Sequence, residues 1–125
     1  MTQTHSSESR SDPAELLQWS IAASERETVV SLVGEIDLAT ADALNQALAQ
    51  AMEGRPARLA VDVSGVSFLD STGIRCFVIG ARKGSEMGCK LVVRNPTAAI
   101  LRVFEICGVD EILLEGVDRD ATQGR

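Results

Sequence analysis

The chain has 125 residues, of which 45% are hydrophobic, and a formal net charge of −6. This length allows one domain with its own hydrophobic core and is too short for two. The acidic charge disfavours direct binding to nucleic acid or to an anionic membrane surface, since both require a basic patch on the protein.

The two ends of the chain differ in composition from its middle. Residues 1–15 are polar and lack the apolar segment of a secretory signal, so we expect a disordered leader there. An ordered domain is expected over 16–115 and a flexible tail over 116–125. The longest strongly apolar uncharged run, 76–81, is far too short to cross a membrane. These features predict a cytoplasmic protein.

Two segments near the N-terminus have the composition of strands. Residues 16–24 alternate between apolar side chains such as Leu17 and Trp19 and polar or small ones, which is typical of a half-buried strand. Residues 28–34 are rich in β-branched side chains, and a short polar turn lies between the two segments. This pattern predicts an antiparallel hairpin.

Three later segments show helical periodicity. Their apolar faces consist of Ala41, Leu44, Leu48, Ala51 and Met52, of Ile74, Phe77, Val78 and Ala81, and of Ile100, Val103, Phe104 and Cys107. Thr40 is predicted to cap the first helix and Asn95 the third, with Pro96 at the first helical position. A glycine follows each helix, at Gly54, Gly88 and Gly108, as is common at helix C-termini.

Short apolar segments between and after the helices predict the remaining strands. Residues 58–63 and 90–95 have the composition of buried parallel strands, and 111–115 is a candidate for a last short strand. The expected order is β-β-α-β-α-β-α-β. It predicts a single α/β domain in which helices flank a mixed, mostly parallel sheet.

The cysteines and the histidine limit the chemistry that the domain can perform. Cys76, Cys89 and Cys107 are widely spaced, which favours reduced, mostly buried thiols over a disulfide framework. The single histidine, His5, falls in the leader. The domain therefore offers no imidazole for a catalytic triad or for zinc, and the sequence has no motif for a metal or another cofactor.

Polar residues gather at two junctions where a strand precedes a helix, at 34–40 and 68–73. Because ligands and chemistry collect at the carboxyl ends of parallel strands, we expect Asp37 to lie near Asp70 and Ser71. An acid or a serine at this point is also an ordinary helix cap, worth about 1 kcal/mol. The capping box that would support this simpler explanation is absent, because Gly73 occupies the position that needs Glu or Gln.

Gly73 also weakens the first turn of the helix and shares one stripe with Gly80 and Gly84. Two explanations remain open, namely close packing on the sheet and a surface that a partner approaches. The opposite side of this helix has a basic face that solvent is expected to cover. It consists of Arg75, Ile79, Arg82 and Lys83.

Ser71 has three candidate roles. The sequence disfavours a catalytic nucleophile, since Leu69 replaces the first glycine of the nucleophile elbow and the domain offers no histidine as its base. A glycine-rich phosphate cradle is missing as well. Phosphorylation remains, because a phosphate of charge about −1.5 to −2 is tolerated at a helix N-terminus. Next to Asp70 and Asp37 it would block a docked partner without unfolding the domain.

Three stretches together carry a family resemblance. "GEIDLAT" (34–40), "VDVSGVSFLDSTGIRCFV" (61–78) and "RVFEICGVDEIL" (102–113) occur in this order. With them the chain resembles the STAS domain of bacterial anti-sigma factor antagonists over roughly 16–115. "DSTG" alone is a weak motif, whereas the three stretches in this order and spacing are a strong one.

The resemblance implies a partner switch. The unphosphorylated protein would bind an anti-sigma factor, a serine kinase with a histidine-kinase-like ATPase fold, and so release a sigma factor. That kinase would phosphorylate Ser71, and a metal-dependent serine phosphatase would reset it. Asp37 matches the family's acidic partner contact, and Asp70, Thr72 and Gly73 complete the motif, with Thr72 as a possible second modified hydroxyl.

Other functions compete with this interpretation. A STAS subunit could dock on a transporter or on a stressosome-like assembly without using the phosphorylation site. A small hydrolase would use Ser71 as its nucleophile, and nucleotide binding at the sheet edge has no supporting motif. The expected outcome is a regulatory module that is not an enzyme.

Overall fold

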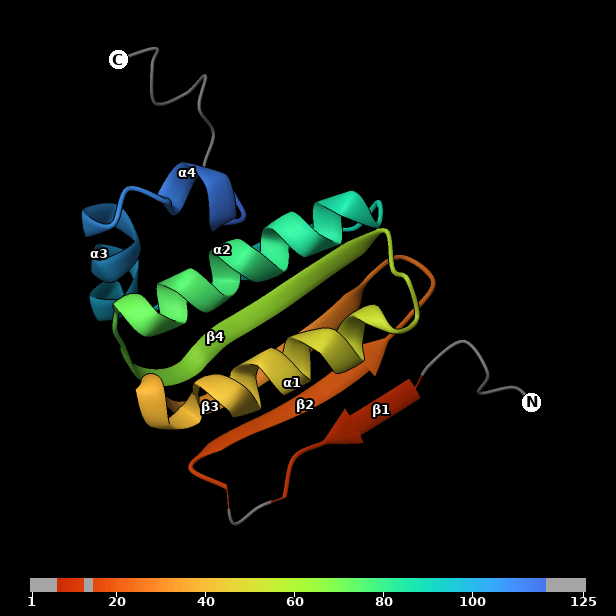
Figure 1. Ribbon diagram of the computed structural model, residues 1–125, viewed down its shortest axis with the longest axis horizontal. Coiled ribbons are helices and arrows are strands. Elements are labelled where there is room, and N and C mark those ends of the chain that lie inside the picture. The colour runs from red at the N-terminus through yellow and green to blue at the C-terminus, as the bar shows by residue number, and fades with distance from the viewer. Residues whose placement is uncertain (1–6, 13–14, 117–125) are drawn as a thin grey trace.

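The computed structural model describes residues 7–12 and 15–116 of the chain (Figure 1). Five strands form one sheet in the order β1-β2-β3-β4-β5. They are β1 (Ser7–Arg10), β2 (Leu17–Ala23), β3 (Thr28–Ile36), β4 (Arg58–Leu69) and β5 (Lys90–Arg94). The helices are η2, a 3-10 turn (Leu38–Thr40), α1 (Ala41–Met52), α2 (Ser71–Glu86), α3 (Ala98–Ile106) and α4 (Asp110–Leu113).

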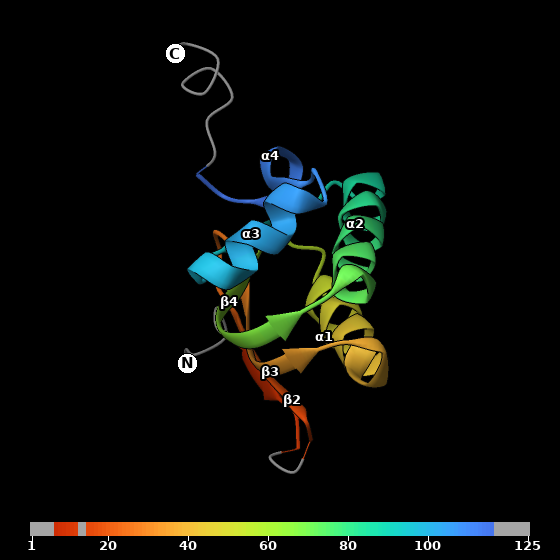
Figure 2. The ribbon, with the colours of Figure 1, turned by 90° about the vertical axis from the view of Figure 1, so that its left-hand side faces the viewer.

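The sheet is mixed, as the sequence predicts. β2 pairs antiparallel with β3, while β3 with β4 and β4 with β5 are parallel. The connections between the parallel strands contain α1 and α2, which lie side by side on one face of the sheet (Figure 2). The prediction of a mixed α/β domain with an N-terminal hairpin and flanking helices is confirmed.

Alternation along the strands creates the core beneath α1 and α2. In β3, for example, Val30 and Leu32 are buried while Val33 is exposed. Phe77 of α2 and Phe104 of α3 are both fully buried, with ring centroids 6.1 Å apart. This contact fixes α3 beside α2. α3 also packs on β4. Among the described residues, no helix has the length and apolar character needed to cross a bilayer.

The leader contains a strand that the sequence analysis did not predict. β1 pairs antiparallel with β2, from Ser7 opposite Ala23 to Arg10 opposite Ser20. Just beyond it, Ser11 N donates to Trp19 O and Ser11 Oγ accepts from Trp19 N, both at 2.8 Å. Backbone pairing along the edge of β2 forms this strand, and polar side chains give it no periodic signal. The expectation of disorder is thus wrong for Ser7–Arg10.

The rest of the expected leader and most of the expected tail cannot be compared with the structure. Residues 1–6, which include His5, lie outside the described residues, as do 13–14 and 117–125.

The predicted last strand over 111–115 is wrong. Asp110–Leu113 form the short helix α4, and only a single bridge joins Leu114 to Val93 of β5. Glu115 N then donates to Val93 O at 2.8 Å. Two acidic residues in the first turn favour the helix, and burial of Leu113 anchors it.

Two predicted helix caps are also corrected. α3 begins at Ala98, and its cap is Thr97, whose Oγ1 accepts from Ile100 N at 3.3 Å. Asn95 instead has a positive φ of 61° and donates from Nδ2 to Asp62 Oδ2 at 2.9 Å. Thr40 precedes α1 but makes no capping hydrogen bond to that helix.

The three cysteines are free thiols and two of the three are buried, as expected. Cys76 and Cys89 lie in the core, whereas Cys107 ends α3 in an exposed position. Burial raises the pKa of Cys76 and of Cys89, so both are poor nucleophiles at neutral pH.

Four charged side chains tie the end of the domain to the sheet. Arg94 donates to both carboxylate oxygens of Glu27, at 3.1 and 3.2 Å, and through Nε to Glu115 at 2.8 Å. Arg58 pairs with the same two carboxylates at 3.5 and 3.4 Å. These four residues, called here the sheet ion network, join the β2–β3 turn, β4, β5 and the segment after α4.

Candidate functional site

The two junctions singled out in the sequence meet at one edge of the sheet. Ile36, the last residue of β3, pairs with Leu69, the last residue of β4. Asp70 N donates to Ile36 O at 3.4 Å. Asp37 and Asp70 therefore start the two neighbouring segments that leave the sheet, and the expectation that these segments face each other is confirmed.

Ser71 is exposed and is the first residue of α2. Asp70 caps this helix, since its Oδ1 accepts from Thr72 N at 3.0 Å. The backbone N–H groups of a first helical turn and the helix dipole both favour an added negative charge. The structure thus offers a reachable hydroxyl at a position where a phosphate would not disrupt the helix.

A reciprocal capping box holds Asp37. Asp37 Oδ1 accepts from Thr40 N at 3.2 Å, and Thr40 Oγ1 accepts from Asp37 N at 3.0 Å. The same buried hydroxyl donates to Glu35 O at 2.8 Å. This role of Thr40 was not predicted from the sequence, although the three-residue spacing from an acid to a hydroxyl was the available signal.

Gly73 is buried beneath the exposed edge of the site around Ser71, called here the rim. A Cβ on this residue would be 2.5 Å from Ile36 Cγ2 and would also overlap Leu69 Cδ1. On the same stripe, a Cβ on Gly80 would be 3.1 Å from Leu48 Cδ1, and one on Gly84 would be 3.1 Å from Cys89 O. All three glycines are buried, so close packing inside the domain explains the stripe, although Gly80 also lines the groove described below.

Two exposed apolar side chains flank the site, and the sequence analysis did not identify them. Leu38 of η2 is 80% exposed and Phe68 of β4 is 47% exposed. Both lie in stretches where apolar and polar residues are mixed without a regular period. The sequence there does not show which apolar side chain faces solvent. Exposed apolar side chains beside a polar centre are typical of surfaces that bind another protein.

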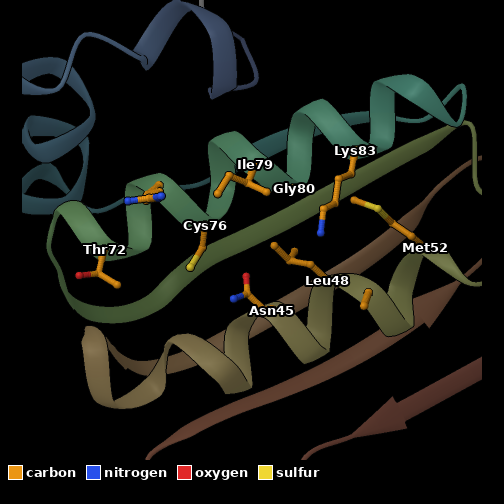
Figure 3. A pocket seen from close by; sticks show the side chains of 10 residues that line it. Asn45, Leu48, Met52, Thr72, Cys76, Ile79, Gly80 and Lys83 are labelled. Atoms are coloured by element: carbon orange, nitrogen blue, oxygen red, sulfur yellow. The ribbon is translucent and has the colours of Figure 1, made fainter.

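A groove of about 390 Å³ begins at Thr72 and runs between α1 and α2 (Figure 3). Thr72 itself is half-buried, less accessible than its neighbour Ser71. Asn45, Leu48 and Met52 point into the groove from α1, and Cys76 and Lys83 from α2 (Figure 3).

The acids of the site act on the backbone. Asp37 and Asp70 accept hydrogen bonds from the amides of Thr40 and Thr72, which places them as helix caps. Within residues 7–12 and 15–116, no group of three or more His, Cys, Asp or Glu side chains is placed to hold a metal ion.

The family model described as "Mlab, STAS domain" matches residues 19–115. The chain belongs to the STAS domain family. A relative from Bacillus subtilis (strain 168), named anti-sigma-B factor antagonist, is 32% identical over 89 residues, which cover 71% of this chain and 81% of the relative.

Solved structures of anti-sigma factor antagonists agree with this assignment. An anti-sigma factor antagonist from Mycobacterium paratuberculosis is 32% identical with a TM-score of 0.67, over 91% of this chain and 97% of its own. The Bacillus protein SpoIIAA shares the fold at 15% identity in its unphosphorylated form, with a TM-score of 0.63 over 95% of this chain and 98% of its own. A structure of its phosphorylated form also matches, at a TM-score of 0.57 over 94% of this chain and 98% of its own.

Proposed function

We propose that this STAS domain is an anti-sigma factor antagonist that phosphorylation of Ser71 switches off. Its unphosphorylated form binds an anti-sigma factor, a serine kinase with a histidine-kinase-like ATPase fold, and thereby releases a sigma factor. The kinase modifies Ser71, and a metal-dependent serine phosphatase restores the hydroxyl. The domain performs no catalysis of its own in this cycle.

One observation carries the proposal, namely the exposed hydroxyl of Ser71 on the first turn of α2 beside the Asp37 segment. The backbone there can hold a phosphate, because the dipole of α2 stabilises negative charge at the N-terminus of the helix. A partner that docks over Asp37, Asp70, Ser71 and Thr72 would meet a dianion that it cannot desolvate. The names of the relatives support the same role.

The first experiment incubates the purified full chain with the anti-sigma factor kinase of the source cell and ATP. We expect one phosphate, located at Ser71 by mass spectrometry, and none on Ser71→Ala. The Thr72→Ala variant shows whether the half-buried Thr72 hydroxyl is a second acceptor. Unmodified Ser71 in the presence of an active, bound kinase would contradict the proposal.

The same variants test the switch in binding. Ser71→Ala should bind the kinase as tightly as the unmodified wild type, because it removes the phosphate acceptor and leaves the surface intact. Ser71→Asp should bind roughly tenfold more weakly, since it places one negative charge at the rim beside Asp70. Equal affinity of Ser71→Asp and Ser71→Ala in titration calorimetry would argue against charge repulsion as the switch.

A further inference from the structure

The groove between α1 and α2 has an apolar floor of largely buried side chains, with one exposed apolar side chain at its edge. Leu48 and Met52 of α1 form one side and are 3% and 7% exposed. Ile79 of α2, which is 38% exposed, forms part of the other side. A concave apolar surface between two helices can hold apolar side chains of a bound segment.

The charges of this groove differ in sign from those of the protein as a whole. The chain has a net charge of −6, yet the charged residues that line the groove are Arg75 and Lys83. They are eight positions apart on α2, which corresponds to about 12 Å along the helix axis. Asp42 and Asp70 lie near the Arg75 end, where their charges act on Cys76, so the Lys83 end is the more basic one.

We propose that this groove receives an acidic segment of the anti-sigma factor, with carboxylates paired to Lys83 and Arg75 and apolar side chains on the floor. This inference rests on the proposed function. Charge complementarity supports it, because the basic groove would attract an acidic segment that the rest of this acidic protein would repel. Continuity supports it as well, since Thr72 lines the groove and directly follows Ser71.

The groove also explains how a phosphate on Ser71 can weaken partner contacts beyond Ser71 itself. Arg75 follows Ser71 by four residues, so the two side chains lie on the same side of α2, one turn apart. A phosphate on Ser71 attracts the Arg75 guanidinium and withdraws this cation from the groove. It also adds negative charge to the end where Asp42 and Asp70 already lie. Phosphorylation therefore weakens the acidic segment's contacts at the Arg75 end and leaves Lys83 unaffected.

The test compares two charge reversals on the same helix. Lys83→Glu reverses a charge inside the groove, whereas Arg82→Glu makes the same change at an exposed neighbour that lines a separate hollow between α2 and α4. By titration calorimetry with the purified kinase, we expect Lys83→Glu to weaken binding roughly tenfold and Arg82→Glu less than about threefold. Equal effects of the two variants, or no effect of Lys83→Glu, would overturn the proposal.

The occupant is identified by cross-linking. A photoreactive p-benzoylphenylalanine in place of Ile79 should cross-link the kinase at a peptide that contains Asp or Glu among apolar residues. A cross-link to a basic peptide, or to a second copy of this chain with concentration-dependent dimerisation that Lys83→Glu abolishes, would overturn it.

Failure of this inference is distinguishable from failure of the proposed function. If the kinase binds wild type and phosphorylates Ser71 but binds Lys83→Glu equally well, only the groove is refuted. If the kinase neither binds wild type nor modifies Ser71, the proposed function fails first.

Discussion

The side chains of Ile36 and Leu69 occupy the space where a Cβ of Gly73 would lie. Glycine at a helical position normally costs up to about 1 kcal/mol relative to alanine. Here the missing Cβ allows the last residues of β3 and β4 to pack directly under the first turn of the helix. The glycine of the "DSTG" motif thus lets the core pack under the first turn of α2, while Ser71 of the same motif stays at the surface.

Replacement of Gly73 by alanine should therefore destabilise the domain despite the gain in helix propensity. We expect Gly73→Ala to lower the free energy of unfolding by about 2 kcal/mol, because two core side chains must move. Gly80→Ala is the matched control on the same helix, since its Cβ would be 3.1 Å from the flexible end of Leu48. Urea denaturation should show a clearly smaller loss for Gly80→Ala. A Gly73→Ala protein as stable as wild type would contradict the packing explanation.

At the scale of elements, the capping box of η2 connects β3 to α1 and fixes Asp37. Replacement of Thr40 by valine keeps the shape of the side chain and removes its hydroxyl. Glu35 O and Asp37 N would then lose these hydrogen bonds in a partly buried site. We expect Thr40→Val to lower the free energy of unfolding by about 1–3 kcal/mol and to weaken kinase binding through Asp37.

The conservative variant Thr40→Ser is the control for this prediction. It keeps the hydroxyl and should retain most of the stability and of the binding in the same denaturation and calorimetry experiments. If Thr40→Ser lost as much stability as Thr40→Val, the methyl group and not the hydrogen bonds would be the important feature.

The elements that the sequence predicted well are those with an internal pattern. α1, α2, β2 and β3 bury every second or every third to fourth residue, so periodicity identifies them, whereas β5 is identified by its continuous apolar run. β1 depends on backbone hydrogen bonds to β2, and α4 on the burial of Leu113 against distant elements. β1 was therefore missed, and α4, whose few residues carry only the two acids of its first turn as a helix signal, was predicted as a strand.

The same reasoning applies to the site. Asp37, Asp70 and Ser71 could be predicted because each follows the end of a parallel strand, and the topology places such ends together. The groove could not be predicted, because it depends on how far apart α1 and α2 pack. The apolar rim residues Leu38 and Phe68 depend on which side of the chain meets solvent, which a mixed local pattern does not decide.

At the scale of the whole molecule, the sheet ion network joins segments far apart in the chain. Hydrogen bonds and the charge of Arg94 hold the pKa of Glu115 below its ordinary value, although partial burial opposes this. Burial alone would raise the pKa of Asp62, but hydrogen bonds from Ser64 and Asn95 and the charge of Arg94 lower it. A carboxyl with a lowered folded pKa stabilises the protein above its unfolded pKa, and this contribution is lost as the pH falls through the folded pKa.

Removal of Arg94 should reduce this pH dependence. For Glu115 the stabilisation is fully present above an unfolded pKa of about 4.3 and disappears at lower pH. We expect Arg94→Gln to be about 1 kcal/mol less stable than wild type at pH 7, since the paired side chains are partly exposed, and to approach wild type near pH 3. Lys90→Gln, which removes an exposed cation from the same strand, should follow the wild-type profile. Urea denaturation from pH 7 to 3 measures the stability of both variants. A difference between Arg94→Gln and wild type that stays constant with pH would show that the network does not couple the C-terminal segment to the sheet through charge.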